Sequence, residues 1–430
     1  MIKTYHLAIL IAFFLVLLYF LYINKPIYSN PVHLLKFSRK YNSSNGSIHR
    51  TNILECREFS DLTSYCLYEN VCLENNEFLF LTNQPDINQA FEFNGRLKDW
   101  DHYEPVDLGG SVIDRQVNNP LPYRSFINGR YVSSSYKKDT INFQNGCHSI
   151  LSFDFFGHNI FHWSMKVSPL FLYQHYNKFN NDNKCKNFTS IRLVDRKLSD
   201  INEWQKRFLE ISTGLKVEGN NYDFTNEPNR KQETIQCFKY FLVPGTAIYL
   251  FTGPREAIDF RKRVSQELNL NFVRERIVLV KRKSRLIKNQ NELEDFIRSK
   301  FDNSSIDIIF LEELNFTQQV EKMSKAKLLI AVHGAGLTNA IFLPSTSAVI
   351  EITAPHFYYP LYERISVQSG HFYFKFVTQY DPTLHSDKYS NRNSRTCMLD
   401  GNCVVHWKDA SIKVDINKFS IMFEQVMEIL

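Results

Sequence analysis

LLIAVHGAGLTNAIFLPSTSAVIEI, residues 328–352, consists of two short apolar runs separated by a segment that holds two closely spaced glycines. Residues 328–332 and 348–352 have the length of β-strands and carry almost no polar side chain. Continuous apolar runs of this length are typical of strands that are buried on both faces of a parallel sheet. The stretch therefore predicts two neighbouring parallel strands with a helical connection at residues 337–344.

Runs of the same kind lie on both sides of this stretch. They are FKYFLVPG (238–245), RIVLVKR (276–282), IDIIFL (306–311), AVIEIT (348–353) and FYFKFV (372–377). Amphipathic segments of helical length separate the later runs, at 289–300, 315–327 and 358–370. Strands that alternate with helices predict a doubly wound, Rossmann-like α/β domain, which binds its ligands at the carboxyl ends of the strands. Residues 55–235 are less regular and indicate α/β structure without a specific architecture.

The sharpest motif, Ala331-Val-His-Gly-Ala-Gly-Leu-Thr-Asn339, stands at one of these carboxyl ends. Glycine allows a tight turn and a close approach of the backbone to a ligand, and a helix that opens at Leu337 would direct free N–H groups toward an anion. A diphosphate fits this chemistry. The alternative is an ordinary tight connection between a strand and a helix. The motif is neither a Walker loop nor a complete dinucleotide fingerprint.

Charged residues at neighbouring strand ends support the anion interpretation. The run KRKSR, residues 281–285, follows the strand at 276–282, and arginine is suited to bidentate phosphate recognition. Glu351 ends the strand after the glycine segment, where a carboxylate could accept hydrogen bonds from ribose hydroxyls. A solvated basic strand end is the alternative for Arg282 and Arg285.

The composition indicates a globular protein, with 43% hydrophobic and 22% charged residues and a formal net charge of only +6. A nucleic-acid partner is not expected, because no basic patch accompanies so small a charge. Residues 7–23 are uninterrupted apolar residues, long enough for an uncleaved signal-anchor helix, although a cleaved signal is the alternative.

The remainder of the chain carries features of a lumenal protein. Five Asn-x-Ser/Thr sequons occur, at Asn42, Asn45, Asn187, Asn303 and Asn315, and the eight cysteines show no zinc-binding spacing. An even number of cysteines behind a secretory signal predicts disulfides in an oxidising lumen, with a pairing that the sequence leaves open. We therefore expect a single-pass type II protein of the Golgi or endoplasmic reticulum membrane. The flanking charges alone favour the opposite orientation.

Three blocks of the sequence resemble glycosyltransferase family 61. The stretch at 328–352 is similar to the signature of that family, and RKSRLIKNQNEL (282–293) is similar to its arginine-rich segment and the helix start behind it. The third block is NIFHW (159–163), with Pro169, Leu170 and Phe171 behind it. The three blocks occur in the family order.

The resemblance implies a GT-B architecture, in which two Rossmann-like domains face a cleft, together with a UDP-sugar donor, no required metal or other cofactor, and typically an inverting reaction. We expect a cytoplasmic tip and anchor at 1–25, a stem at 26–50, an acceptor-side domain at 51–240 and a donor-binding domain at 241–430. The acceptor would be a glycan or a glycoprotein. By the resemblance, His333, Gly334, Gly336 and Thr338 cradle the diphosphate, and Arg282 and Arg285 neutralise it. The expected donor-binding set also includes Asn289, Ala335, Leu337 and Glu351, and we expect Asn159 and Trp163 on the acceptor side.

The resemblance does not identify the catalytic base, because residues 163–168 (WSMKVS) hold no acid where many relatives have one. An inverting transferase needs a group that takes the proton of the acceptor hydroxyl. Asp154, His158 and His162 are the candidates. If His162 is the base, activity should rise with pH through a pKa near 6.5. The missing acid also keeps open a catalytically inactive relative that binds a glycan or a nucleotide. Asp99-Trp100-Asp101 matches the D-x-D pattern of metal-dependent transferases and is attributed to chance.

Overall fold

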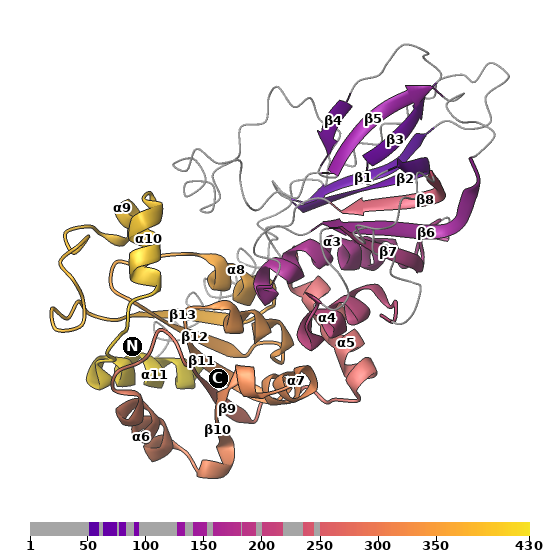
Figure 1. The fold of residues 1–430 in the computed structure, drawn as a ribbon. Helices are drawn as coiled ribbons and strands as arrows, with labels where there is room; N and C mark the ends of the chain where they lie inside the picture. Colours follow the sequence, from indigo (N-terminus) through magenta and orange to yellow (C-terminus); the bar gives the residue numbers. More distant parts are fainter. Residues whose placement is uncertain are drawn as a thin grey trace, which may run out of the picture.

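The protein is an α/β molecule built on two β-sheets, seen here in a computed structural model (Figure 1). The N-terminal sheet has eight strands and the C-terminal sheet has five. The structure describes residues 51–59, 63–74, 77–82, 90–93, 127–133, 141–152, 158–181, 183–194, 200–217, 235–244 and 250–430. The predicted anchor, the stem, Asp154 and the D-x-D pattern lie outside these residues.

The C-terminal sheet is wholly parallel, with the strand order β10-β9-β11-β12-β13. Its strands are β9 (Arg276–Lys281), β10 (Ile306–Phe310), β11 (Ala326–Val332), β12 (Ala348–Thr353) and β13 (Phe372–Val377). In chain order this is a 2-1-3-4-5 arrangement, the order of one common doubly wound fold. The parallel sheet expected from the apolar runs is confirmed.

Helices cover both faces of this sheet. Strand residues alternate between two hydrophobic cores, so that Val278 and Leu329 belong to one core and Ile277 and Ile330 to the other. The first core also holds apolar side chains of α7 (Phe316–Ser324), η8 (Ala335–Phe342) and α8 (Leu361–Gln368). The second holds those of α6 (Gln290–Lys300) and α11 (Ile416–Ile429). Because both faces are buried, the strands had to be apolar throughout.

The connection after β11 differs from the expected α-helix. It is a 3-10 helix, η8, that begins at Ala335 and ends at Phe342, two residues earlier at each end than predicted. Two further 3-10 turns, η6 (Asn303–Ser305) and η7 (Leu311–Glu313), flank β10. After β13 the chain forms α9 (Ser394–Met398) and α10 (Gly401–Lys408) before α11.

The N-terminal sheet is mixed, with the order β4-β5-β3-β2-β8-β6-β7 and with β1 paired to β2. Its strands are β1 (Asn52–Phe59), β2 (Thr63–Glu74), β3 (Glu77–Thr82), β4 (Ala90–Phe93), β5 (Ile127–Ser133), β6 (Phe143–Ser152), β7 (Phe188–Val194) and β8 (Gln236–Pro244).

Only part of this sheet has Rossmann-like connectivity. Strands β6, β7 and β8 are parallel neighbours, joined by α3 (Ile160–Asn177) and α4 (Glu203–Thr213). Antiparallel pairing of β2 with β1, β3 and β8 extends the unit, and β4 and β5 also pair antiparallel. A mixed α/β fold with parallel strands in both sheets is compatible with the expected architecture, but the N-terminal half is not a simple doubly wound sheet. The predicted domain limit at 240/241 falls inside β8, and the domain division stays a prediction.

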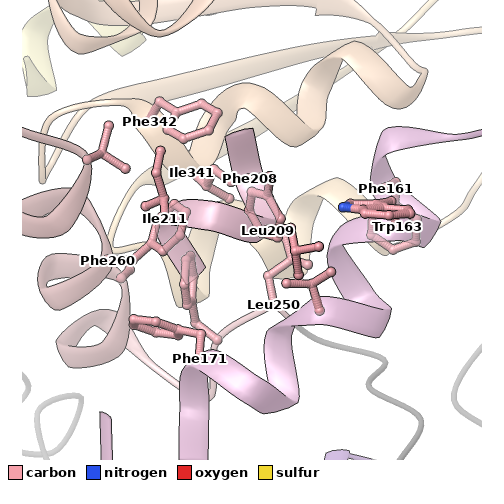
Figure 2. Close-up of a cluster of buried hydrophobic side chains, with 14 of the residues drawn as sticks. Phe161, Trp163, Phe171, Phe208, Leu209, Ile211, Leu250, Phe260, Ile341 and Phe342 are labelled. Carbon is pink, nitrogen blue, oxygen red and sulfur yellow. The ribbon is translucent and has the colours of Figure 1, made fainter. Parts of the chain in front are cut away.

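The helices α3, α4 and α5 (Pro254–Leu268) lie between the two sheets (Figure 1). One hydrophobic core runs through them, from Phe171 and Phe208 to Phe260 and Phe342 (Figure 2). The ring centroids of Phe260, in α5 of the layer, and Phe342, in η8 of the C-terminal half, are 6.0 Å apart. Because of this shared core, the helix layer packs directly against the elements that carry the glycine motif.

Disulfides are confirmed, and within the described residues the structure gives the pairing of six cysteines. Cys72 bonds Cys237 across β2 and β8, and Cys147 of β6 bonds Cys185. Cys397 and Cys403 join α9 to α10. Across the described residues, no helix is long and apolar enough to cross a membrane.

Candidate functional site

The predicted blocks meet at the carboxyl edge of the C-terminal sheet, between β9 and β11. The chain passes from β9 to β10 on one side, and β11 returns to pair on the other side of β9. A reversal of this kind opens a crevice beyond the strand ends, where doubly wound sheets bind their ligands. Arg282 follows β9 directly and His333 follows β11 directly.

Two arginines converge on a single carbonyl oxygen at this edge. Arg282 Nη1 donates to the His333 oxygen at 2.9 Å, and Arg285 Nη1 donates to the same oxygen at 3.2 Å. Arg285 Nε also donates to Asp409 Oδ1 at 3.1 Å, at the end of α10. Burial lowers the pKa of Arg282, and the neighbouring charge of Arg285 lowers it further. Two adjacent guanidinium groups with one largely exposed carboxylate partner form a site that favours an anion.

The backbone at Arg285 supports a specialised role. Its φ angle is 56°, in the left-handed region that glycine favours. A side chain held there costs free energy, on the order of 1–3 kcal/mol, and such residues cluster at functional sites.

Gly334 is required by the packing of Arg282. A Cβ atom at Gly334 would lie 1.5 Å from Arg282 Nη1, which leaves no room for any side chain. At Gly336 a Cβ atom would lie 2.8 Å from Leu311 Cδ1, the end of a flexible side chain. The first glycine therefore serves a contact inside the protein, in addition to any approach of the backbone to a ligand.

His333 and Glu351 form a buried pair. His333 Nδ1 contacts Glu351 Oε1, and Tyr373 donates its hydroxyl to Glu351 Oε2. Glu351 is completely buried. Because both carboxylate oxygens already accept hydrogen bonds, a ribose hydroxyl would have to displace one of them. The His333 side chain is 9% exposed, and Nε2 has no hydrogen-bond partner among the described residues.

The other predicted donor residues divide into two groups. Ala335 is half-buried beside the loop, whereas Leu337 and Thr338 are buried, and Thr338 Oγ1 has no hydrogen-bond partner in the described part of the chain. Asn289 instead donates to the Val414 carbonyl at 2.8 Å and accepts from the Val414 amide at 2.9 Å. Its side chain thus attaches the segment before α11 to the start of α6.

The NIFHW block lies against the same edge through aromatic contacts. The Phe161 ring is 6.0 Å from the Tyr362 ring, and the Tyr362 ring is 5.0 Å from that of His333. Asn159 accepts a hydrogen bond from the Phe161 amide at 2.9 Å, so it caps α3, a usual function of asparagine at a helix start. Trp163 is buried in the shared core. The structure therefore brings all three blocks together.

Of the three candidate bases, His158 and His162 lie within the described residues, and His158 is exposed. Burial lowers the pKa of His162 to about 4, and Lys166 contributes in the same direction. The imidazole is therefore neutral at physiological pH, as a proton acceptor must be.

Three residues whose side chains contact this edge of the sheet were not predicted from the sequence. Tyr362 and Tyr373 had no signal that distinguished them from the other tyrosines of this tyrosine-rich chain, and Asp409 is far away in the sequence. Within the described residues, no group of three or more His, Cys, Asp or Glu side chains could hold a metal ion.

Comparison with known proteins agrees with the motifs. Residues 160–350 match the sequence model of the family described as Glycosyltransferase 61. The chain is 29% identical over 167 residues, 36% of its length and 28% of the relative's, to protein O-linked-mannose beta-1,4-N-acetylglucosaminyltransferase 2 of Xenopus laevis. It is 39% identical over 70 residues, 16% of its length and 13% of the relative's, to the EGF domain-specific O-linked N-acetylglucosamine transferase of Bos taurus.

The matched region spans less than a third of the length of either of these relatives. Within residues 160–350 lie the NIFHW block almost completely, the arginine run, and the glycine motif with β11 before it and the first half of β12 behind it. The shared region is thus the one that the structure folds around a single sheet edge. This match, the two relatives and the chain's own motifs agree in their similarity to the glycosyltransferase 61 family.

Proposed function

We propose that the protein is a glycosyltransferase that transfers one sugar from a UDP-sugar to a glycan or glycoprotein acceptor, with inversion at the anomeric carbon. In this reaction an acceptor hydroxyl oxygen bonds to the anomeric carbon as the bond from that carbon to the diphosphate oxygen breaks. The hydroxyl proton passes to a base, and UDP leaves with the bonding electron pair. The match to the glycosyltransferase 61 model and the two relatives support transfer as the activity.

The observation that carries the proposal is the convergence of Arg282 and Arg285 on the His333 carbonyl. Negative charge grows on the diphosphate as the sugar departs, and preorganised cationic donors stabilise such a transition state. Arg282 Nη2 and Nε have no hydrogen-bond partner among the described residues, so they are available to phosphate oxygens. In this proposal the arginines supply the stabilisation, with no metal required.

The base and the cellular setting belong to the same proposal. His162, neutral and at the start of α3, would take the acceptor proton, with Asp154 as the alternative. We further propose a type II protein of the Golgi or endoplasmic reticulum membrane with its catalytic part in the lumen. Asn187 and Asn315, both exposed, would then be available for glycosylation. Endoglycosidase treatment that leaves the gel mobility unchanged would count against this topology.

One observation favours a second function. Residues 163–168 hold no acid, and a relative without a working base would bind a glycan or nucleotide without turnover. Incubation of the purified protein with a panel of UDP-sugars and acceptors separates the two functions. Sugar transfer supports the enzyme, whereas UDP binding without any transfer or donor hydrolysis supports the binding protein.

Titration with UDP by calorimetry tests the site itself. Arg282→Ala and Arg285→Ala should each weaken UDP binding roughly tenfold to a hundredfold, because a hydrogen bond to a charged group contributes about 1.5–3 kcal/mol. Lys283→Ala is the matched control, since Lys283 is 61% exposed and pairs with Glu313 at 2.9 Å. If both arginine variants bind UDP like the parent, the donor site lies elsewhere.

A further inference from the structure

Tyr362 is a buried aromatic residue between the two halves of the candidate site. It is the second residue of α8, in the first turn, and it is 4% exposed. Its ring packs against His333 from the C-terminal sheet and against Phe161 from α3. These contacts fix the ring from both sides, so the direction of its hydroxyl is set by packing.

The hydroxyl of Tyr362 has no hydrogen-bond partner among the residues that the structure describes, although the backbone carbonyl accepts from Ser366. The residue as a whole is buried, but its hydroxyl oxygen is not among the fully enclosed unpaired polar atoms of the described residues, so a ligand atom can reach it. By contrast, Tyr373 at the same edge donates its hydroxyl to Glu351. Of these two tyrosine hydroxyls, only that of Tyr373 has a hydrogen-bond partner within the described part of the chain.

The charges around Tyr362 are those of the anion site. Burial raises its pKa, and Glu351 raises it further, whereas Arg282 and Arg285 act in the opposite direction. The hydroxyl therefore lies within the electrostatic reach of both guanidinium groups. Because burial dominates, the group stays protonated at working pH and can only donate toward an anion.

We propose that Tyr362 is a third donor of the diphosphate site, whose hydroxyl binds a phosphate oxygen of UDP beside Arg282 and Arg285. This inference rests on the proposed function, because it needs UDP to bind at this edge. The arginines approach from the end of β9 and Tyr362 approaches from the start of α8, so the diphosphate is held from two elements. A neutral hydroxyl donor orients the phosphate by a directional hydrogen bond, and it adds no third positive charge that would repel the two arginines.

The experiment compares Tyr362→Phe with Tyr358→Phe by calorimetry, using UDP and inorganic pyrophosphate as probes. Tyr362→Phe keeps the ring contacts and removes an oxygen that has no described partner, so thermal stability should not change. Its affinity for both probes should fall about tenfold or more, since both present the same phosphate oxygens. Tyr358, whose hydroxyl donates to Glu363 at 3.5 Å, is the matched control and should bind both probes like the parent.

The possible results distinguish a failure of the proposed UDP site from a failure of the role of Tyr362. If the parent binds neither probe, the proposed function fails together with this inference. If the parent binds both probes and Tyr362→Phe binds them equally well, only the role of Tyr362 is overturned. A loss of UDP affinity with unchanged pyrophosphate affinity would also overturn it, because the hydroxyl would then contact another part of the nucleotide.

Discussion

His162 shows how burial changes the chemistry of a single residue. The exposed imidazole has an ordinary pKa near 6.5, and removal from water lowers it in this protein to about 4. A neutral imidazole in this position accepts a proton over the whole range above pH 5. The pH dependence expected from the sequence alone therefore moves to lower pH.

If His162 is the base, kcat/KM should stay constant from pH 7 to pH 5.5 and should fall to half of its maximum only near pH 4. The sign follows from the lowered pKa, because protonation removes the acceptor only below that value. His162→Ala should reduce kcat by roughly 10² to 10⁴ and leave UDP affinity unchanged.

His175→Asn serves as the control, since His175 lies at the other end of the same helix and pairs with Asp259 at 2.9 Å. An activity that halves near pH 6.5, or full activity of His162→Ala, would assign the base to another group, with Asp154 the first to test.

The connection between β11 and η8 is the element on which the site depends. Its extended residue Gly334 lies against the guanidinium of Arg282, and that guanidinium donates back to the carbonyl of His333. Strand end and loop thus hold each other in place. The glycine is explained by its contact with Arg282, whose guanidinium reaches the carbonyl of a residue 51 positions away in the chain.

Gly334→Ala should therefore weaken UDP binding about as much as Arg282→Ala, because the methyl group displaces the guanidinium. Calorimetry with UDP measures the effect, and a thermal melt shows whether the fold persists. Gly253→Ala is the control, since its Cβ would meet only Glu256 Oε2 at an ordinary 3.5 Å. Unchanged UDP affinity in Gly334→Ala would show that the Arg282 position seen here is not needed for binding.

On the scale of the whole molecule, a buried hydrogen bond connects the two halves. Trp204 Nε1 of α4 donates to Asn339 Oδ1 of η8 at 3.1 Å, and Asn339 Nδ2 donates to Gln319 of α7 at 3.1 Å. Asn339 is the last residue of the glycine motif. The last residue of the motif therefore holds the helix layer, whereas His333 and Gly334 near its start contact the guanidinium of Arg282.

Trp204→Phe should lower the free energy of unfolding by about 1–3 kcal/mol, because it leaves the buried Asn339 carbonyl oxygen without its donor. Urea denaturation of the parent and the variant measures the loss. A double-mutant cycle with Asn339→Ala isolates the pair, and the two single losses should not add. Fully additive losses would mean that the two residues do not interact in solution.

The sequence by itself predicted the C-terminal sheet and the edge at which the motifs meet. Strands buried on both faces are apolar at nearly every position, so RIVLVKR and LLIAVHG could be recognised locally. The carboxyl ends of parallel strands share one edge, so the sequence alone predicted that Arg282 lies near His333. The N-terminal sheet was not predictable in this way, because the pairing of β2 with β8 joins Cys72 to a residue 165 positions away.

Only the tertiary structure decided which atoms these residues touch. The sequence predicted that the Glu351 carboxylate binds ribose hydroxyls. In the structure Glu351 is completely buried, and its two oxygens contact His333 and Tyr373. Asn289 stood in a family motif, yet it holds the backbone of Val414. Local patterns report whether a side chain is buried, but hydrogen-bond partners depend on segments that meet only on folding. Tyr362 became a candidate for the same reason, because its neighbours come from a distant strand end and from a helix of the other half.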